Sequence, residues 1–175
     1  YVIDRKFDYI MYLDADNWFQ KNHVNSLLDL IKNETSIACS YRSFYTMAEK
    51  KMSYLEDDDC LSKKFVDTSC YLIPKKFFQL INIWHLIPNE TSQWCDRIFF
   101  FNILKNKCPI KFSEMHTVAF RTLYDVHYLH SNLDLPKDVK KSDEINKKAV
   151  KFFSNLNNKE SFVKTFGFWW NPGKK

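Results

Sequence analysis

The chain has 175 residues, of which 45% are hydrophobic and 17% aromatic, and this is enough apolar material for the core of one domain. Only two glycines occur, Gly167 and Gly173, which excludes a glycine-rich phosphate loop of the P-loop or dinucleotide-binding type. The net charge of +5 lies entirely in residues 131–175, which hold ten Lys and five acids, whereas residues 1–130 are neutral. This tail has no Arg and mixes its lysines with acids, as solvated helices do, which argues against a nucleic-acid-binding protein.

Five cysteines, an odd number without a Cys-x-x-Cys pair, argue against a zinc ribbon and against a disulfide framework. Reduced thiols in a cytoplasmic protein fit this pattern best. No stretch has the length of a membrane-spanning helix and no signal peptide is recognised, although the basic tail is compatible with peripheral contact at an anionic membrane. The chain begins with Tyr1 in mid-pattern, so we expect a piece of a longer protein.

In the first part of the chain, the pattern predicts a strand, a helix, a second strand and a long loop. The apolar residues 7–13 predict a buried strand, and the spacing of Val24, Leu27, Leu28 and Ile31 predicts an amphipathic helix over 20–32. Residues 36–41 predict a short strand. Residues 42–64 are polar and end in four consecutive acids at 56–59, which is typical of a solvated loop.

In the second part, strands and helices continue to alternate, which predicts an α/β fold. The expected elements are a strand over 65–73, a buried helix from Pro74 to about Leu86, a helix over 98–104, and strands over 109–112 and 117–123. A helix beginning at Ser142 follows, with Ile145, Ala149, Phe152, Phe153 and Leu156 in one stripe. The apolar residues 166–170 are expected to dock on the domain or on a partner.

Asp14 and Asp16 follow the first predicted strand and are one residue apart. Alternate side chains of a strand share a face, so the two carboxylates are expected to point the same way. Two like charges held together are costly unless a cation lies between them, and a divalent metal that carries phosphate oxygens is a common solution. A solvated Asp-Ala-Asp turn explains the same three residues.

The sequence around these acids resembles family-2-type glycosyltransferases with the GT-A fold. The similar blocks are, in order, FDYIMYLDADNWF, FVDTSCYLIPKKFFQL, WHLIP, WCDRIFFFNILK and TVAFRTLYDVHYLH. This resemblance covers roughly residues 1–130. It implies a Rossmann-related, mixed and mainly parallel sheet flanked by helices, forming the catalytic part of a GT-A domain in residues 1–130. Residues 131–175 are then a basic helical extension packed on that domain.

The resemblance also implies roles for single residues. Asp14 and Asp16 match the positions that hold Mn²⁺ or Mg²⁺ and the diphosphate of the donor, and His127 matches a late third metal ligand. Asp96 matches the catalytic base of inverting members, although Cys95 stands where many members have Glu. A helix cap explains Asp96 equally well, and a hydrogen-bonded histidine explains His127.

Four further residues are candidates for contacts with the substrates. Arg97 is a candidate contact to phosphate or sugar, unless it pairs with a neighbouring acid. Asp67 is a candidate contact to sugar or acceptor. Trp84 and Trp94 are candidates for stacking on a sugar, with a core position as the alternative for Trp84.

The expected function is therefore the transfer of a sugar from a nucleotide-sugar donor, expected to be a UDP-sugar, to a hydroxyl of a glycan or lipid-linked acceptor. The strands that bind the nucleotide in this family precede the Asp-x-Asp strand, and their counterpart does not precede Tyr1. A non-catalytic GT-A-like module for sugar binding or interaction is the alternative. Nucleotidyl transfer onto a sugar phosphate ranks third, because that chemistry usually needs a Gly-rich and basic loop near the start.

Overall fold

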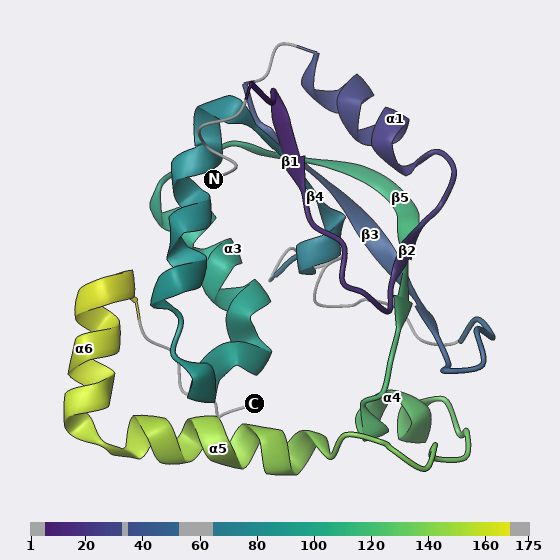
Figure 1. Cartoon of the computed structure of the whole chain (residues 1–175), viewed down its shortest axis with the longest axis vertical. Helices are drawn as coiled ribbons and strands as arrows, with labels where there is room; N and C mark the ends of the chain where they lie inside the picture. Colours follow the sequence, from purple (N-terminus) through teal and green to yellow (C-terminus); the bar gives the residue numbers. More distant parts are fainter. Residues whose placement is uncertain (1–5, 33–34, 53–64, 169–175) are drawn as a thin grey trace.

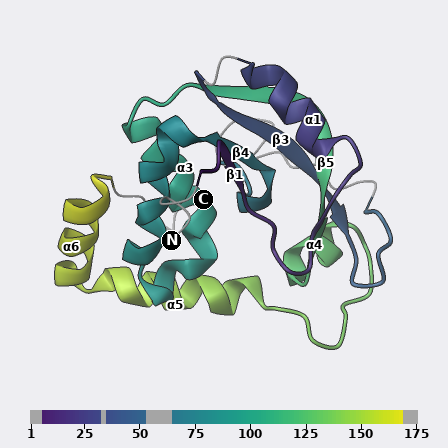
Figure 2. The same ribbon diagram turned by 45° about the horizontal axis from the view of Figure 1, so that its top comes forward.

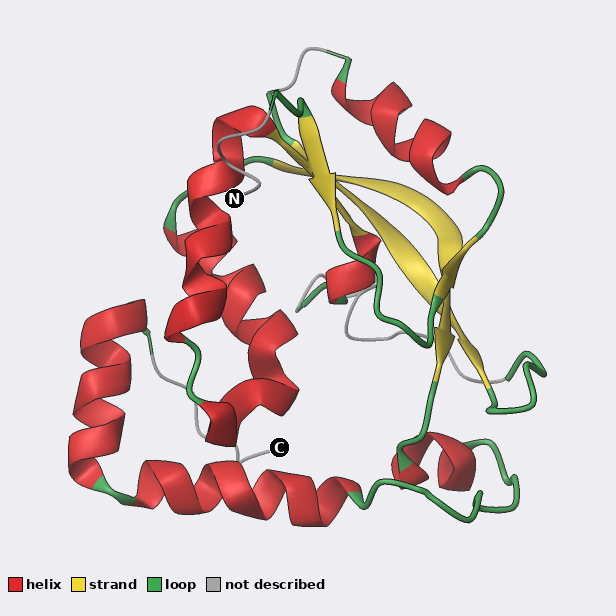
Figure 3. Cartoon of the chain, in the orientation of Figure 1, coloured by secondary structure: helices red, strands yellow, loops and turns green. Residues whose placement is uncertain are grey.

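The computed structural model describes residues 6–32, 35–52 and 65–168. Within these residues, five strands form one curled sheet with helices around it (Figures 1 and 3). The strands are β1 (Tyr9–Met11), β2 (Trp18–Phe19), β3 (Ile37–Tyr45), β4 (Tyr71–Pro74) and β5 (Ile110–Arg121), in the spatial order β1-β4-β3-β5-β2. The α/β class expected from the sequence is thus confirmed.

The sheet is mixed, as expected, but its described pairs are mainly antiparallel. Only β3 and β5 pair in parallel, whereas β1–β4, β3–β4 and β2–β5 are antiparallel. The expectation of a mainly parallel sheet is therefore wrong. The three strands β1, β3 and β5 do run in the same direction, but β4 is inserted between β1 and β3, and β2 lies at the edge beside β5, each in the opposite direction.

The helical segments of the described residues are of α and 3₁₀ type. They are α1 (His23–Leu28), η1 (Asp29–Ile31), η2 (Thr68–Cys70), η3 (Lys75–Leu86), η4 (Asn89–Trp94), α3 (Cys95–Lys105), α4 (Asp125–His130), α5 (Ser142–Ser154) and α6 (Leu156–Phe166). Figures 1 and 2 show α1 and α3 on opposite faces of the sheet. None of the helices among the described residues combines the length and the apolar character that crossing a membrane requires.

Alternation along the central strands creates two apolar layers. Ala38 and Leu72 pack with Leu27 and Ile31 of the α1–η1 segment on one face. Their neighbours point to the other face and join the larger cluster, which includes residues of η3, α3, α5 and α6. Side chains of a strand alternate between faces, so both faces of these strands are buried, which explains their near-continuous apolar sequence.

The predicted helix over 20–32 is confirmed as the shorter pair α1 and η1, with one difference in its buried stripe. Leu27 and Ile31 are buried, but Val24 is 42% exposed and His23 is fully buried in its place. The ring of His23 stacks on Phe19 with 4.1 Å between ring centres. Its Nδ1 also shares a hydrogen bond of 2.7 Å with the Thr117 hydroxyl. A polar partner inside the core thus allows a histidine where the spacing predicts a valine.

The predicted strand over 65–73 is only partly confirmed, because β4 begins at Tyr71. The three preceding residues form the 3₁₀ turn η2, which is capped by Asp67. The carboxylate of Asp67 accepts a hydrogen bond from Ser69 N at 3.0 Å, and its carbonyl accepts one from Cys70 N at 2.9 Å. These local bonds compete with sheet pairing and bend the chain away from a strand.

The two strands predicted over 109–112 and 117–123 are one strand, β5. Extra residues are accommodated in it, because Cys39 of β3 faces Phe112 while Tyr41 faces His116. Glu114 lies within this irregular stretch and has a φ of 55°. A bulge of this kind keeps a strand continuous although its alternation is interrupted, so the pattern predicts two strands instead.

The helices predicted over 74–86, 98–104 and from Ser142 are confirmed as η3, α3 and α5. Leu156, however, is 65% exposed and begins α6 instead of completing the stripe of α5. Phe166 is buried and Phe168 packs on the same cluster, so the expected docking is confirmed up to residue 168. The acidic run at 56–59 and the residues 169–170 lie outside the described residues. Among these described residues, the cysteines at 39, 70, 95 and 108 form no disulfide.

Candidate active-site cleft

A cleft of about 510 Å³ opens where the C-terminal ends of β1 and β5 meet α4 and the first turns of α3 and α5. Several residues with a role expected from the sequence line it together: Asp14, Asp16, Asp67, Trp94, Asp96, Arg97 and His127. They come from four separate segments of the chain. The structure thus brings these side chains together, and their chemical roles stay predictions.

The loop after β1 is held in shape by Asn17, a buried residue that the sequence pattern did not single out. The side-chain amide of Asn17 donates to the Ser69 hydroxyl at 3.2 Å and to Asp14 Oδ2 at 3.4 Å, while its Oδ1 accepts from Arg121 N at 3.1 Å. Asn17 N also donates to the Asp14 carbonyl at 3.0 Å. Through these bonds, Asn17 connects the loop after β1 to η2 and to β5. Asp14 and Asp16 of this loop stay exposed along the cleft.

Arg42 forms an ion pair with Asp67 at the base of the cleft. Its Nη1 lies 2.6 Å from Asp67 Oδ2, and both side chains are nearly buried. The guanidinium is also surrounded by the rings of Phe44, Phe65 and Phe120, whose centres are 4.8, 5.2 and 4.5 Å from Cζ. Arg42 was expected in a solvated loop, and that expectation is wrong because β3 continues to Tyr45. Arg42 is the only charged residue in the sequence of β3, and this is the signal that could have revealed the pair.

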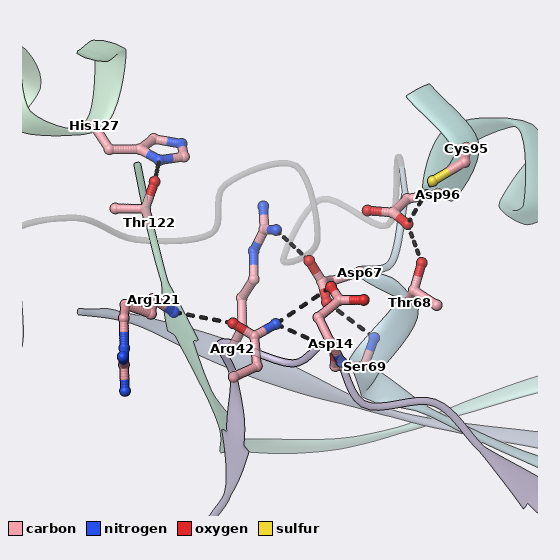
Figure 4. Close-up of polar contacts among 11 residues, drawn as sticks. Asp14, Arg42, Asp67, Thr68, Ser69, Cys95, Asp96, Arg121, Thr122 and His127 are labelled. Carbon is pink, nitrogen blue, oxygen red and sulfur yellow. Dashed lines mark hydrogen bonds and ion pairs between the residues drawn. The ribbon is translucent and has the colours of Figure 1, made fainter. Parts of the chain in front are cut away.

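Asp96 lies in the first turn of α3, as expected, and faces the cleft (Figure 4). Burial and the nearby carboxylate of Asp67 raise its pKa to about 7, against the opposing effects of the Thr68 hydroxyl and the Arg42 charge. Asp14 is exposed as a residue, but partial withdrawal of its carboxylate from solvent raises its pKa, with Asp67 and Asp16 adding to this effect. An Asp with a pKa near neutrality is a stronger base than an ordinary Asp, and about half of it is ionised at pH 7.

His127 lines the same cleft from α4. Its Nδ1 shares a hydrogen bond of 2.6 Å with the Thr122 hydroxyl, and burial together with the Arg42 charge lowers its pKa to about 4. A neutral imidazole is the form that can bind a metal. However, no three His, Cys, Asp or Glu side chains within the described part of the chain come together as a metal-binding group. The three-ligand set of Asp14, Asp16 and His127 therefore stays a prediction.

Three further candidates differ in their surroundings. Arg97 lines the cleft, with its guanidinium carbon 4.4 Å from the centre of the Phe65 ring. Trp94 also lines the cleft and packs partly on the core. Trp84 is partly buried against the core, stacked at 4.8 Å on Phe99, and its Nε1 donates to the Tyr12 hydroxyl at 3.0 Å. Because Trp84 does not line the cleft, its packing supports the core alternative.

The C-terminal segment supplies one wall of the cleft, which the sequence did not indicate. Lys140, Ser142, Ile145 and Asn146 line it from the start of α5 and the residues just before it. Asp125 of α4 holds this wall, because its Oδ1 accepts hydrogen bonds from Ser142 N at 2.9 Å and from the Ser142 hydroxyl at 2.7 Å. The described part of the C-terminal segment, residues 131–168, therefore contributes to the candidate site as well as to the core.

The chain was compared with models of known protein families and with curated proteins, and neither comparison finds a match.

Proposed function

We propose that this chain carries the catalytic cleft of a metal-dependent, inverting glycosyltransferase that uses a nucleotide sugar, with a UDP-sugar as the first donor to test. The supporting observation is that two exposed carboxylates after β1 share one cleft with Asp96, whose pKa is about 7. Acidic oxygens for the donor's metal and a near-neutral base for the acceptor are the two requirements of this chemistry.

In the proposed reaction, Asp96 acts on the acceptor, whereas Asp14 and Asp16 act on the donor. The acceptor hydroxyl oxygen attacks the anomeric carbon of the sugar as its proton passes to Asp96. The bond between this carbon and the diphosphate breaks, and its electron pair leaves on the diphosphate oxygen. The new glycosidic bond forms on the opposite face, which inverts the configuration. A glycan or a lipid-linked sugar would supply the hydroxyl.

Asp14 and Asp16 would hold Mn²⁺ or Mg²⁺, which neutralises the charge of the leaving diphosphate when it is bound. Their carboxylates fit such an ion, because hard cations prefer oxygen ligands and Mg²⁺ is commonly bound by one or two carboxylates together with substrate phosphates. Both side chains are exposed along the cleft and can reach such a ligand. Two carboxylates are therefore enough protein ligands for such an ion, and His127 is a candidate for a third.

The proposal is tested by titrating the protein with MnCl₂ and UDP in a calorimeter. Both the present chain and a version extended upstream are used, each beside Asp16→Ala. Manganese-dependent UDP binding that Asp16→Ala removes is the expected result. Asp29→Ala, which removes an exposed acid from η1, is the matched control and should leave binding unchanged. An absence of manganese-dependent nucleotide binding in both versions would refute the proposal.

A non-catalytic sugar-binding or interaction module is the second candidate. It is favoured by the aromatic side chains along the cleft, Phe65, Trp94, Phe120 and Tyr124, since aromatic rings provide binding surface without any need for a base. Asp96→Asn distinguishes the two functions. It should abolish turnover of the donor in an enzyme, whereas a binding module would show no turnover before or after the change and would bind its ligand equally well.

A further inference from the structure

We propose that Thr68 and Cys95 are positioning residues that orient the carboxylate of Asp96, so that its Oδ2 is the atom that receives the acceptor's proton. This inference rests on the proposed function for the role of Asp96. The arrangement of the three side chains is independent of that function.

The hydrogen bonds of Asp96 are asymmetric. The Thr68 hydroxyl donates to Oδ1, and the Cys95 thiol donates to the same oxygen with an Sγ–Oδ1 distance of 3.6 Å. Within the described part of the chain, no hydrogen bond reaches Oδ2. Figure 4 shows both donors on one side of the carboxylate and the other oxygen turned away from them. Two donors on one oxygen restrict the rotation of the carboxylate and leave the second oxygen available to a substrate.

Thr68 is itself held in place by a chain of buried contacts. It follows Asp67, whose Oδ1 accepts from Ser69 N and thereby caps η2. The other oxygen of Asp67 pairs with Arg42 of β3. The hydroxyl of Thr68 is thus fixed relative to the central strand of the sheet, whereas Asp96 belongs to α3. The hydrogen bond between them connects the base, through Asp67 and Arg42, to the central strand β3.

Cys95 precedes Asp96 at the start of α3 and lines the cleft. Burial and the negative charge of Asp96 raise the pKa of this thiol, so it stays protonated and able to donate. This explains how a Cys can stand beside the base in place of an acid. A Glu at this position would add a negative charge, whereas the thiol adds a neutral donor.

The charged groups that face Asp96 define what a change at Thr68 should do. Asp67 and Asp14 disfavour the ionised carboxylate, while the Arg42 charge and the Thr68 hydroxyl favour it. A hydrogen bond to the charged form of an acid lowers its pKa, so loss of the hydroxyl should raise the pKa of Asp96. Thr68→Ser removes a methyl group but keeps the hydroxyl, so it should not raise the pKa of Asp96.

The test is a pH titration of the Asp96 carboxyl carbon by ¹³C NMR in the full chain, with Asp96→Asn used to assign the signal. We expect Thr68→Val to move the midpoint upward by about one to two pH units, since a hydrogen bond to the charged carboxylate is lost. Thr68→Ser, which keeps the hydroxyl, should restore the midpoint of the unmodified protein. Cys95→Ala should move it upward by less, because a thiol is a weak donor.

Thr91→Val is the matched control, because it removes the hydroxyl of a buried Thr that donates to the Pro88 carbonyl and does not touch Asp96. An unchanged midpoint in Thr68→Val, or the same shift in Thr91→Val, would overturn the inference. Should Thr68→Val fail to fold, the titration midpoints of Asp96 in Cys95→Ala and in Cys95→Ser give the decisive comparison. Shifts as expected without any manganese-dependent UDP binding would refute the proposed function and leave the arrangement around Asp96 intact.

Discussion

Arg42 and Asp67 carry opposite charges that are both almost withdrawn from solvent, with side chains 10% and 2% exposed. Removing one partner of such a pair leaves an uncompensated buried charge, which typically costs about 3–5 kcal/mol. We therefore expect Arg42→Met to lower the free energy of unfolding by roughly this amount, measured by urea denaturation. Replacing Asp67 by Asn in the same chain should recover part of the loss.

Arg121 provides the control for this prediction. Its Nη2 lies 2.6 Å from Glu49 Oε1, the same distance as in the buried pair, but the side chain of Glu49 is 61% exposed. Exposed ion pairs contribute about 0–1 kcal/mol, so Arg121→Met should have a small effect. Equal losses in the two variants would show that burial does not determine the strength of the Arg42 pair.

His23 is the second residue whose burial has a measurable consequence. Burial lowers its pKa from an ordinary value of 6.5 to about 4 in the folded protein. Between these two values the unfolded chain binds the proton more strongly, so stability falls as the pH decreases from 6.5 to 4 and is then constant with respect to this group. The loss attributable to His23 is at most about 3 kcal/mol.

His23→Gln should flatten this part of the stability curve, measured by thermal unfolding at a series of pH values. A residual slope is expected from His127, whose pKa is also lowered to about 4. His85 is exposed, so His85→Gln serves as the control and should leave the curve unchanged. An unaltered slope in His23→Gln would contradict a neutral, buried His23.

At the scale of elements, helices could be predicted because their apolar residues repeat with a helical period, as in α3 and α5. The strands were less predictable, for local reasons. Asp67 caps η2 and delays β4, and the irregularity around Glu114 divides the alternation of β5 although the strand is continuous. Both effects depend on single residues with special backbone roles, and a periodic pattern does not contain them.

The helix α6 was not expected, yet it carries two of the most buried aromatic residues of the C-terminal segment. Phe162 is 2% exposed and packs against Phe153 and Phe166 at 5.0 and 4.3 Å between ring centres. Phe162→Ala should therefore lower the free energy of unfolding by about 3–5 kcal/mol. Leu156 in the same helix is 65% exposed, and Leu156→Ala should change it by less than about 0.5 kcal/mol. Urea denaturation of both variants tests whether α6 is docked.

At the scale of the whole molecule, sequence order could not predict which side chains lie beneath the acids of the cleft. Asp14, Asp16 and Asp96 share a cleft as expected. Arg42 enters it because β3 continues beyond the predicted strand end and pairs with β5, a contact between segments more than seventy residues apart. The wall from α5 likewise depends on long-range packing, since η4 and α5 are joined by the bond from Gln93 Nε2 to the Ile145 carbonyl at 3.2 Å. Such contacts leave no pattern in the sequence near the residues that form them.

This packing also bears on the expected division at residue 130. One apolar cluster contains Tyr71 and Phe99 of the central part together with Phe153 and Phe162 of the C-terminal segment. A shared core cannot be opened on one side without exposing the other, so the chain should unfold as one cooperative unit. Far-ultraviolet circular dichroism and tryptophan fluorescence should then give coincident urea curves, and Phe162→Ala should shift both by the same amount. A helical signal that is lost first, with fluorescence unchanged, would instead show that residues 131–175 form a separate extension and that the wall they contribute to the cleft can detach.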